Sequence, residues 1–528
     1  MIKKVYAKAI AEVYENKSYL ILSFIISSYV FTAQLIVYNA KRQILAVVIS
    51  IFLLFLISKL SKLVFSLVSL SVLLITGILL HINYHWGTGS LVERLQAAML
   101  SPPYESIEYL SNYFNYFDSL ILLYYAVGIY LLSIYMVKFN YSFRILKIPG
   151  VIILSMAYLI LSNTVYIKMI EPYKHVPKLL LAGEWKDIVD RRLVYLDELN
   201  IEKKSIRGDV PNYEKIILIM GESVNKSHLG VYDYNVPTTP FLSQLATKQN
   251  SYIFDNVIAA ANQTRYSIPI SLTDIKVNEF SQFPTSKSIV SVFKEYGFKT
   301  YWLSNQYMAG MHDSYIATIS SEADYSKTEN FCYVRGGGAK SEHDMVLIDY
   351  LSKLDINNNN KEVYFIHLLG SHFQYNKRYP DGAGIYAKPG NIVDEYDNSI
   401  HYSDDVMSMI YDLFKDKNIL FIYTADHGEV VHKNKSGHGF IPSYQDEYNI
   451  PLVIFSSLDN KRLVTLKDLN TKKLFNTASF NHILQYIVGI ENDTSKISTD
   501  ASVIDVDLEN IQNYYALGNF EDKRLSSN

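Results

Sequence analysis

Carboxylate and imidazole side chains follow a mostly apolar run late in the chain. The run 421–425 ends in Asp426-His427-Gly-Glu, and His438 follows after a short polar loop. This pattern is typical of a buried strand that delivers polar residues at its carboxyl end, where open α/β sheets place their chemistry. Carboxylate oxygen and imidazole nitrogen suit zinc or manganese. The alternative is a polar turn in which Asp426 is a cap and the histidines are exposed.

Two other strand candidates end in residues of the same kinds. The stretch 215–220 is followed by Gly and then Glu222, and the stretch 362–368 carries His367, with His372 a few residues later. Because the carboxyl ends of parallel strands meet at one edge of a sheet, we expect these groups to converge with the Asp-His pair. Two carboxylates, a histidine and an open position are what a divalent metal needs to act on a phosphoryl oxygen.

Thr264 is the residue best placed to act as a nucleophile at such a centre. It lies in the segment 260–269, where small residues lead through Thr and Ser into a predicted helix. A hydroxyl at a helix amino terminus lies near free N–H groups and the positive end of the dipole, which favour an alkoxide and a phosphate. Thr264 could then attack phosphorus and form phosphothreonine. The alternative is that Thr264 is only a helix cap.

The spacing of apolar residues predicts the elements that carry these groups. From residue 213 onward, short apolar stretches alternate with helical patterns, which predicts an α/β domain with a mostly parallel sheet and helices on both faces. The expected strands are 215–220, 299–304, 362–368, 418–424 and 451–456, and the expected helices are 286–296, 340–355, 402–416 and 476–489.

The first third of the 528-residue chain is far more apolar than the rest. Five stretches are nearly free of charge and close to the roughly 20 residues that a helix needs to cross a bilayer. They are 19–38, 44–58, 63–82, 119–137 and 148–167. The sequence therefore predicts three parts: a transmembrane domain of five helices over 1–167 with a long loop at 83–118, an amphipathic bridging helix and linker over 168–212, and a catalytic domain over 213–528.

Lysine and arginine in the short loops orient the predicted helices. They are frequent before the first helix and in the loops near 59–62 and 138–147, which places these segments on the cytoplasmic side, although Lys41-Arg42 runs against this rule. We therefore expect a cytoplasmic amino terminus and a catalytic domain outside the membrane. The first helix is expected to be an uncleaved anchor, because no cleavage pattern follows it.

Charge and cysteine content exclude two further classes. The formal net charge is −3 and no basic run occurs, which argues against a nucleic-acid partner. Cys332 is the single cysteine, so no internal disulfide can form.

Taken together, the motifs resemble those of membrane-anchored phosphoethanolamine transferases of the alkaline phosphatase and sulfatase superfamily, which modify lipopolysaccharide in Gram-negative bacteria. The matching motifs occur in the family's order: Gly221-Glu222-Ser223, Thr264 to Pro269, His367 to His372, Asp426 to Glu429 and His438-Gly439. The resemblance implies a sulfatase-like periplasmic domain on an inner-membrane anchor. It also implies that phosphatidylethanolamine is the donor, that a lipid A, core or O-antigen sugar is the acceptor, and that the protein is a monomer.

The resemblance further assigns roles within the site. It implies that Thr264 is the nucleophile and holds a zinc ion together with Glu222, Asp426 and His427, with manganese or magnesium as alternative ions. His372 and His438 would bind the substrate phosphate or a second zinc, and one of them would protonate the leaving group. The substrate contacts that it implies are Asn305 and Gln306 for the phosphoethanolamine group, and Ser101 and Glu105 for its amine. Glu429 has no assigned role.

Two departures from the family pattern point to a different branch. Members that modify lipid A carry several disulfides, one pair flanking the nucleophile, where this chain has Ala260 and Ile270. This favours core or O-antigen sugars as acceptor. Ala97 replaces an Asn of some members in the membrane-proximal loop. The alternatives are a phosphoglycerol transferase that acts on a periplasmic glycan, and a sulfatase or phosphodiesterase, although the sequence around Thr264 lacks the formylglycine pattern of sulfatases.

Overall fold

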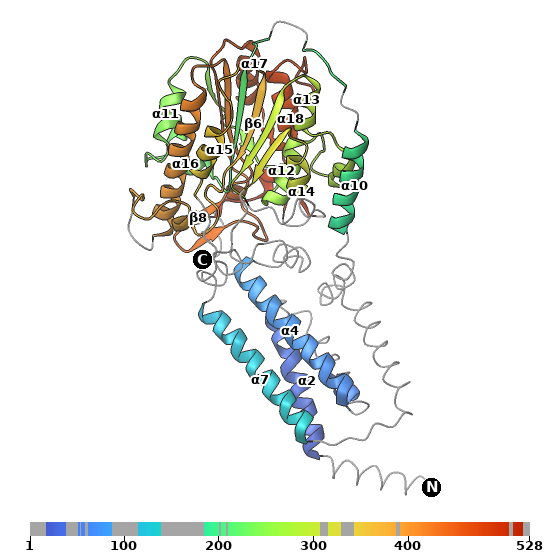
Figure 1. Cartoon of the computed structure of the whole chain (residues 1–528). Helices are drawn as coiled ribbons and strands as arrows, with labels where there is room; N and C mark the ends of the chain where they lie inside the picture. Colours follow the sequence, from blue (N-terminus) through green and yellow to red (C-terminus); the bar gives the residue numbers. More distant parts are fainter. Residues whose placement is uncertain are drawn as a thin grey trace. The chain divides into compact units, whose positions relative to one another are not determined.

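The computed structural model forms two compact units (Figure 1), the N-terminal unit Met1–Ala98 with Tyr109–Leu181, and the C-terminal unit Met99–Glu108 with Ala182–Asn528. The structure describes residues 17–37, 51–52, 54–58, 62–86, 115–138, 184–199, 202–206, 210–306, 315–328, 343–386, 391–505 and 510–520.

The described part of the N-terminal unit is helical. Its long helices are α2 (Lys17–Val37), α4 (Lys62–Trp86) and α7 (Tyr116–Lys138). They pack around a small apolar cluster that includes Phe65 and Tyr135, whose rings lie 4.8 Å apart. Large apolar side chains on their outer surfaces stay exposed, which is a surface that a lipid environment favours over water.

The helices agree in part with the predicted spans. Of the described helices, Tyr116–Val137 is long and apolar enough to cross a membrane, and Ile21–Val30 and Lys62–Ile78 are shorter apolar helices. The predicted span 44–58 is described only from residue 51, where it is helical, and 148–167 lies outside the described residues. The five-helix bundle therefore stays a prediction.

The predicted loop 83–118 is shorter than expected at both ends. Helix α4 continues to Trp86 because no glycine or proline occurs between residue 78 and Gly87, and α7 already begins at Tyr116. One extra turn of α4 thus carries His85, and the first turn of α7 carries Asp118.

A seven-stranded sheet forms the centre of the C-terminal unit, in the order β2-β10-β7-β1-β6-β4-β5. The strands are β1 (Lys215–Gly221), β2 (Ser251–Ile253), β4 (Lys299–Ser304), β5 (Tyr325–Thr328), β6 (Glu362–His367), β7 (Ile419–Ala425) and β10 (Leu452–Ser456). All five predicted strands are present, and β2 and β5 are additional strands at the two edges.

The sheet is mixed rather than parallel throughout. Strands β7, β1, β6, β4 and β5 pair in parallel, but β10 is antiparallel to both β7 and β2. A parallel neighbour needs a crossover, usually a helix. The connection from β7 to β10 instead holds the small hairpin β8 (Val430–His432) and β9 (Lys435–Gly437) and a single 3-10 turn. The chain therefore returns directly beside β7 and runs in the opposite direction.

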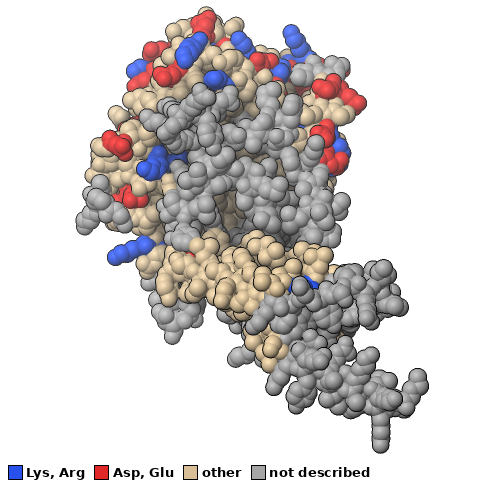
Figure 2. Space-filling view, turned by 60° about the horizontal axis from the view of Figure 1, so that its bottom comes forward, with Lys and Arg blue, Asp and Glu red and all other residues tan. Residues whose placement is uncertain are grey.

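Helices cover both faces of this sheet (Figure 1). Helices α11 (Pro240–Ala246) and α16 (Ile392–Phe414) lie on one side, and α12 (Thr264–Leu272), α13 (Ile289–Glu295) and α18 (Phe480–Ile487) lie on the other. The helix predicted for 402–416 begins earlier because the Asn391 side chain accepts a hydrogen bond from Val393 N and caps α16. Acidic and basic side chains are interspersed around the visible surface of this unit (Figure 2).

Helix α10 (Glu184–Glu198) lies within the predicted bridging segment 168–212 and belongs to the C-terminal unit, where one buried arginine holds it. Arg192 donates hydrogen bonds to the Phe283 and Ser286 carbonyls at 2.8 and 2.9 Å, and to Glu322 Oε1 at 2.6 Å. Its side chain is fully buried. Because an unpaired buried charge is strongly unfavourable, this ion pair fixes one orientation of α10 on the unit.

Candidate active site

The carboxyl ends of two neighbouring central strands, β1 and β7, set two carboxylates side by side. Gly221, at the end of β1, pairs with Ala425, at the end of β7, so the next residues along each strand are Glu222 and Asp426. The pairing continues past the strands, since Asp426 N donates to Gly221 O at 3.0 Å. Both side chains and the neighbouring His427 are buried. Parallel register therefore brings together the three residues that the sequence predicts as ligands.

His427 presents an unprotonated nitrogen to these carboxylates. Its Nδ1 lies 2.8 Å from the Gly428 carbonyl, which can only accept, so Nδ1 carries the proton of the neutral ring. Burial lowers the pKa of His427, which keeps the ring neutral. Its Nε2 then faces Glu222 Oε1 at 3.5 Å and Asp426 Oδ2 at 3.4 Å, with a lone pair toward two acceptors.

The Asp426 carboxylate is hydrogen-bonded on one oxygen only. Ser223 N and His427 N donate to Oδ1 at 3.1 and 2.7 Å, whereas Oδ2 is buried without a hydrogen-bond partner. Burial and the nearby Asp426 charge raise the pKa of Glu222 well above its usual value. Burial acts to raise the pKa of Asp426 as well, but the neighbouring His427 brings it below its usual value.

These donors fit a divalent cation. A buried carboxylate oxygen without a donor, a second carboxylate and an imidazole lone pair all face one point, which is unfavourable unless positive charge lies there. The donor atoms of Glu222, Asp426 and His427 lie within 4.8 Å of one another. Two carboxylates, one imidazole and the Thr264 hydroxyl would make a four-ligand set suited to zinc.

Thr264 brings its hydroxyl to the same point from the start of α12. Its Oγ1 lies 3.2 Å from Glu222 Oε2 and 3.3 Å from His427 Nε2. Two further contacts hold this segment: Ser267 Oγ donates to the Asp426 carbonyl, and the Ala260 N–H donates to Thr477 Oγ1 at 2.8 Å. The nucleophile candidate is thus fixed to the strand that carries the metal ligands.

Glycine at position 370 allows the loop after β6 to approach Glu222. Gly370 has a φ of +53°, and a Cβ there would lie 2.9 Å from the Glu222 N–H nitrogen. The Ser371 N–H donates to the Glu222 carbonyl at 3.0 Å. The loop that carries His372 is therefore packed directly against the residue after β1.

The predicted histidines lie in different surroundings. His372 is half-buried beyond β6, and burial, followed by the charge of Arg378, lowers its pKa to about 3. His367, the last residue of β6, is buried with no hydrogen-bond partner for Nε2, and burial lowers its pKa to about 4. Neither His367 nor His372 belongs to the groups of convergent metal donors among the described residues.

His438 is held by a buried carboxylate that had no assigned role. Its Nδ1 donates to Glu429 Oε2 at 2.7 Å, and Tyr375 OH donates to Glu429 Oε1 at 2.6 Å. The His438 ring lies 4.1 Å from the ring of His427. Burial acts to lower the pKa of His438, but the Glu429 carboxylate raises it above its usual value. Glu429 therefore orients His438 and favours its protonated form.

The two amide residues after β4 differ in their contacts. Gln306 Nε2 donates to Glu222 Oε2 at 2.9 Å and to the Leu368 carbonyl at 3.0 Å, which brings it to the candidate centre. Asn305 is buried and donates to Asp344 Oδ1 at 2.9 Å, a carboxylate that also accepts the Leu369 and Gly370 N–H groups. Asn305 thus supports the His372 loop in this structure. Ser101, Glu105, Ala97 and Cys332 lie outside the described residues.

Sequence reasoning missed the residues that support the ligands. Ser223 adopts a φ of +58° and donates from its hydroxyl to Glu222 Oε1 at 2.7 Å while its N–H reaches Asp426. A left-handed non-glycine residue two positions after a strand is a sign of a constrained functional turn, but the conformation is not readable from sequence. Its position next to Glu222 was the available signal. Tyr375 and Asp344 gave none.

The part of the chain that carries these residues is similar in sequence to known proteins. A sequence model of the Sulfatase family matches residues 214–484. YhbX of Escherichia coli K12, provisionally named a transferase, is 30% identical over 279 residues, which are 52% of this chain and 49% of YhbX. Phosphoethanolamine transferase EptC of the same strain is 27% identical over 46% of this chain and 45% of its own length. The chain spans about half the length of the curated relatives that it matches.

Solved structures agree with the fold. The integral membrane lipooligosaccharide phosphoethanolamine transferase A (EptA) of Neisseria meningitidis matches 89% of this chain and 94% of its own at 16% identity, with a TM-score of 0.58. The C-terminal periplasmic domain of Escherichia coli EptC, crystallised as a complex with Zn, matches 60% of this chain and 97% of its own at 21% identity, with a TM-score of 0.50. The predicted sulfatase-like domain is confirmed.

Proposed function

The chain belongs to the sulfatase family, and from this premise we propose that it transfers phosphoethanolamine from phosphatidylethanolamine to a lipopolysaccharide acceptor. One observation carries the proposal: the Thr264 hydroxyl lies 3.2 and 3.3 Å from two members of the buried group Glu222, Asp426 and His427. A hydroxyl nucleophile beside a metal-binding group is suited to phosphoryl transfer. The names of the relatives EptC and EptA support phosphoethanolamine as the transferred group.

In the first step, Thr264 Oγ1 attacks the phosphorus of the donor lipid. The Thr264 oxygen bonds to phosphorus, its proton passes to Glu222 Oε2, and the bond from phosphorus to the diacylglycerol oxygen breaks. His438 gives its proton to that oxygen as it leaves. The free N–H groups at the start of α12 stabilise the charge on the phosphoryl oxygens.

In the second step, an acceptor hydroxyl attacks the phosphorus of phosphothreonine. The acceptor proton passes to His438, the bond between Thr264 and phosphorus breaks, and Glu222 returns a proton to the Thr264 oxygen. One site can thus serve donor and acceptor in turn. A zinc ion held by Glu222, Thr264, Asp426 and His427 would lower the pKa of the Thr264 hydroxyl and neutralise phosphoryl charge, with manganese or magnesium as the alternative ion.

The remaining parts of the proposal concern the place of the enzyme. We assign residues 1–167 to an anchor in a bacterial inner membrane, 168–212 to a bridging segment, and 213–528 to a periplasmic catalytic domain that works as a monomer. The exposed apolar surfaces of α2, α4 and α7 support the anchor. Ser101 and Glu105 are proposed to meet the donor amine, and Gln306, His372 and Asn305 to lie near the bound phosphoethanolamine group.

The decisive experiment traps the intermediate. The full-length protein is incubated with phosphatidylethanolamine in the absence of acceptor, and peptides that contain Thr264 are analysed by mass spectrometry. We expect a phosphoethanolamine adduct on Thr264, loss of adduct and transfer in Thr264→Ala, and retention of both in Thr264→Ser. A phosphoglycerol adduct, formed when phosphatidylglycerol is offered, would favour the alternative enzyme. Normal transfer by Thr264→Ala would overturn the scheme.

The acceptor is found by a separate comparison. Lipopolysaccharide from cells with and without the gene is fragmented into lipid A, core and O-antigen, and the mass of each fraction is determined by mass spectrometry. The absence of a lipid A-type disulfide pair beside Thr264 favours a mass difference in the core or O-antigen fraction. A difference confined to lipid A would contradict this assignment, and the absence of any difference would direct attention to a periplasmic glycan.

A further inference from the structure

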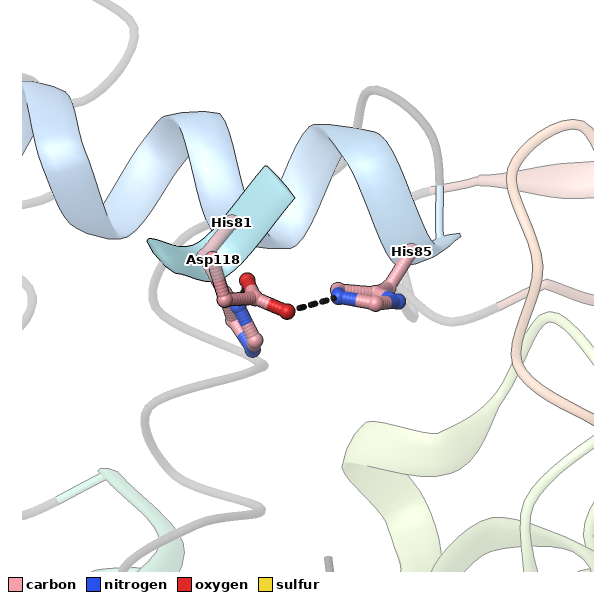
Figure 3. A group of neighbouring side chains, drawn as sticks. All are labelled: His81, His85 and Asp118. Atoms are coloured by element: carbon pink, nitrogen blue, oxygen red, sulfur yellow. Dashed lines mark hydrogen bonds and ion pairs between the residues drawn. The ribbon is translucent and has the colours of Figure 1, made fainter. Parts of the chain in front are cut away.

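A second group of histidine and carboxylate side chains lies in the N-terminal unit (Figure 3). His81 and His85 project from the end of α4, and the Asp118 carboxylate, from the first turn of α7, lies toward both rings. His81 Nδ1 is 2.5 Å from Asp118 Oδ1, and His85 Nε2 is 3.1 Å from Asp118 Oδ2. The side chains of His85 and Asp118 are 8% and 4% exposed and that of His81 is 25% exposed, so the group is largely shielded from solvent.

The chain holds these side chains in place from both helices. His81 and His85 are four residues apart and therefore share one face of α4. Asn115 caps α7 by accepting the Phe117 N–H at 2.8 Å, and its own N–H donates to Asp118 Oδ2 at 2.9 Å. This reciprocal cap fixes the carboxylate at the start of the helix. The Tyr84 ring, stacked on Phe117 at 4.2 Å, joins the two helices beside the histidines.

From this geometry we propose that His81, His85 and Asp118 form a zinc site. The ligand atoms of the three residues lie within 4.8 Å of one another, and the two imidazole rings are 4.7 Å apart. Two imidazole nitrogens and one carboxylate oxygen are a donor set typical of zinc, and three protein ligands leave a fourth position for water or a ligand oxygen. No residue of the candidate active site takes part, so this proposal is independent of the proposed function.

A hydrogen-bonded clamp is the competing explanation. One histidine and the helix cap would suffice to satisfy a carboxylate, yet a second imidazole, one turn away, is also directed at it. A metal explains why both ring nitrogens and the carboxylate meet at one point between the helices. The ion would join the end of α4 to the start of α7, and in the predicted topology these ends face the extracytoplasmic side.

The test measures bound metal in the full-length protein purified in detergent. We compare zinc content, by plasma mass spectrometry, of the wild type, Asp118→Asn, Asp426→Asn and the double variant. Asp118→Asn keeps one oxygen that can accept the Asn115 N–H, so it is a mild change to the helix cap. We expect each single variant to lose zinc from one site and the double variant to lose both. Equal zinc content in Asp426→Asn and the double variant would overturn the proposal.

A second measurement keeps the test decisive if Asp118→Asn fails to fold. Asp426→Asn is loaded with zinc, and the ligands of the remaining ion are determined by X-ray absorption spectroscopy. We expect two imidazole nitrogens and carboxylate oxygen. Folded Asp426→Asn that retains no zinc would show that the three residues are only a clamp. Exchange of His401, a helix histidine of the C-terminal unit, for alanine is the control and should leave zinc content unchanged.

Discussion

The two carboxylate and histidine groups of this chain rest on different scaffolds. At the sheet edge, the register of β1 and β7 sets Glu222 beside Asp426, so their separation follows from the backbone hydrogen bonds of the sheet. In the N-terminal unit, Asp118 meets its histidines only because two helices pack together. The distance between the strand-end carboxylates is therefore set by the backbone of one sheet, whereas the distance between Asp118 and its histidines depends on how two helices pack. The following predictions test the first of these scaffolds, the C-terminal unit with its sheet.

The largest effect is expected from removing charge at the sheet edge. In Asp426→Asn, the amide oxygen can still accept the Ser223 and His427 N–H groups, so the turn after β7 is kept. The charged oxygen that has no hydrogen-bond partner is lost. We expect transfer to fall by about 10³-fold or more, because metal binding and charge stabilisation are both removed. The measurement is the rate of phosphoethanolamine transfer.

The unfolding curve of the metal-free protein provides the control for this prediction. If the strand ends are preorganised, metal-free Asp426→Asn should unfold at the same temperature as the metal-free wild type or at a slightly higher one, since repulsion between two buried carboxylates is relieved. Asp459→Asn, an exposed substitution in the same unit, should change neither the transfer rate nor the unfolding temperature. A transfer rate within tenfold of the wild type would show that Asp426 holds no essential ion.

A smaller effect is expected from the carboxylate that orients His438. Glu429→Gln has nearly the same shape, but it removes the charge that His438 Nδ1 contacts at 2.7 Å. We expect kcat to fall by about 10 to 100-fold with little change in KM, as for other residues that orient a catalytic histidine. Because Glu429 raises the pKa of His438, its loss should lower that pKa and move the alkaline limb of the kcat profile to lower pH.

The pH profile separates orientation from a purely structural role. Tyr375→Phe removes the other donor to Glu429 but keeps its charge beside His438, so its alkaline limb should stay in place. If Glu429→Gln lowers kcat without moving the limb, His438 is not the proton donor and Glu429 serves packing alone.

The same contrast explains what could be predicted from sequence. Glu222, Asp426 and His427 were found because each follows a short apolar run, and strand ends that share an edge must converge. Thr264 was found because a hydroxyl precedes an apolar helix. His81 and His85 were not singled out, because the helix was expected to end at residue 82 and Asp118 is distant in sequence. Hydrophobic patterning predicts strand edges well, but it carries no information on which turns of two helices meet.

The role of Glu429 was hidden for a related reason. Its partners, Tyr375 and His438, come from separate loops, and loop contacts are not encoded in periodicity. The antiparallel direction of β10 was missed because the segment after β7 was not recognised as lacking a crossover helix. By contrast, the strands themselves were predicted closely, since each is a compact apolar run with polar residues at its ends.

The rigidity of the sheet edge can be tested at a glycine. Gly370→Ala would place a Cβ 2.9 Å from the Glu222 nitrogen in a left-handed backbone conformation. We expect a loss of about 2 kcal/mol in the free energy of unfolding, together with weaker metal binding, because Glu222 must shift. Gly297→Ala is the matched control: its φ is also positive, at +80°, but nothing lies within 4 Å of the new Cβ. If both variants lose the same free energy of unfolding, the close contact between position 370 and Glu222 adds no strain of its own.

The smallest effect concerns a buried carboxylate that accepts its hydrogen bonds from backbone N–H groups. Asp404 accepts the Phe241 and Leu242 N–H groups at the start of α11, at 2.6 and 3.1 Å. Burial nevertheless raises its pKa to about 7. The folded state thus holds a proton that the unfolded chain releases near its ordinary value. Stability should rise as the pH falls through 7, and this contribution is lost as the pH rises.

Between pH 8 and pH 6 we expect the free energy of unfolding to increase by about 1 kcal/mol through this group. Asp404→Asn should remove that part of the slope, and the difference between the two proteins, measured by urea unfolding at each pH, isolates Asp404 from other titrating groups. Identical slopes would mean that two helix N–H groups stabilise the charged carboxylate fully. Two helix N–H groups alone would then stabilise a buried carboxylate. Hydrogen bonding would not explain why Asp118, at the start of a helix, is also contacted by two histidines, and this would favour the metal site.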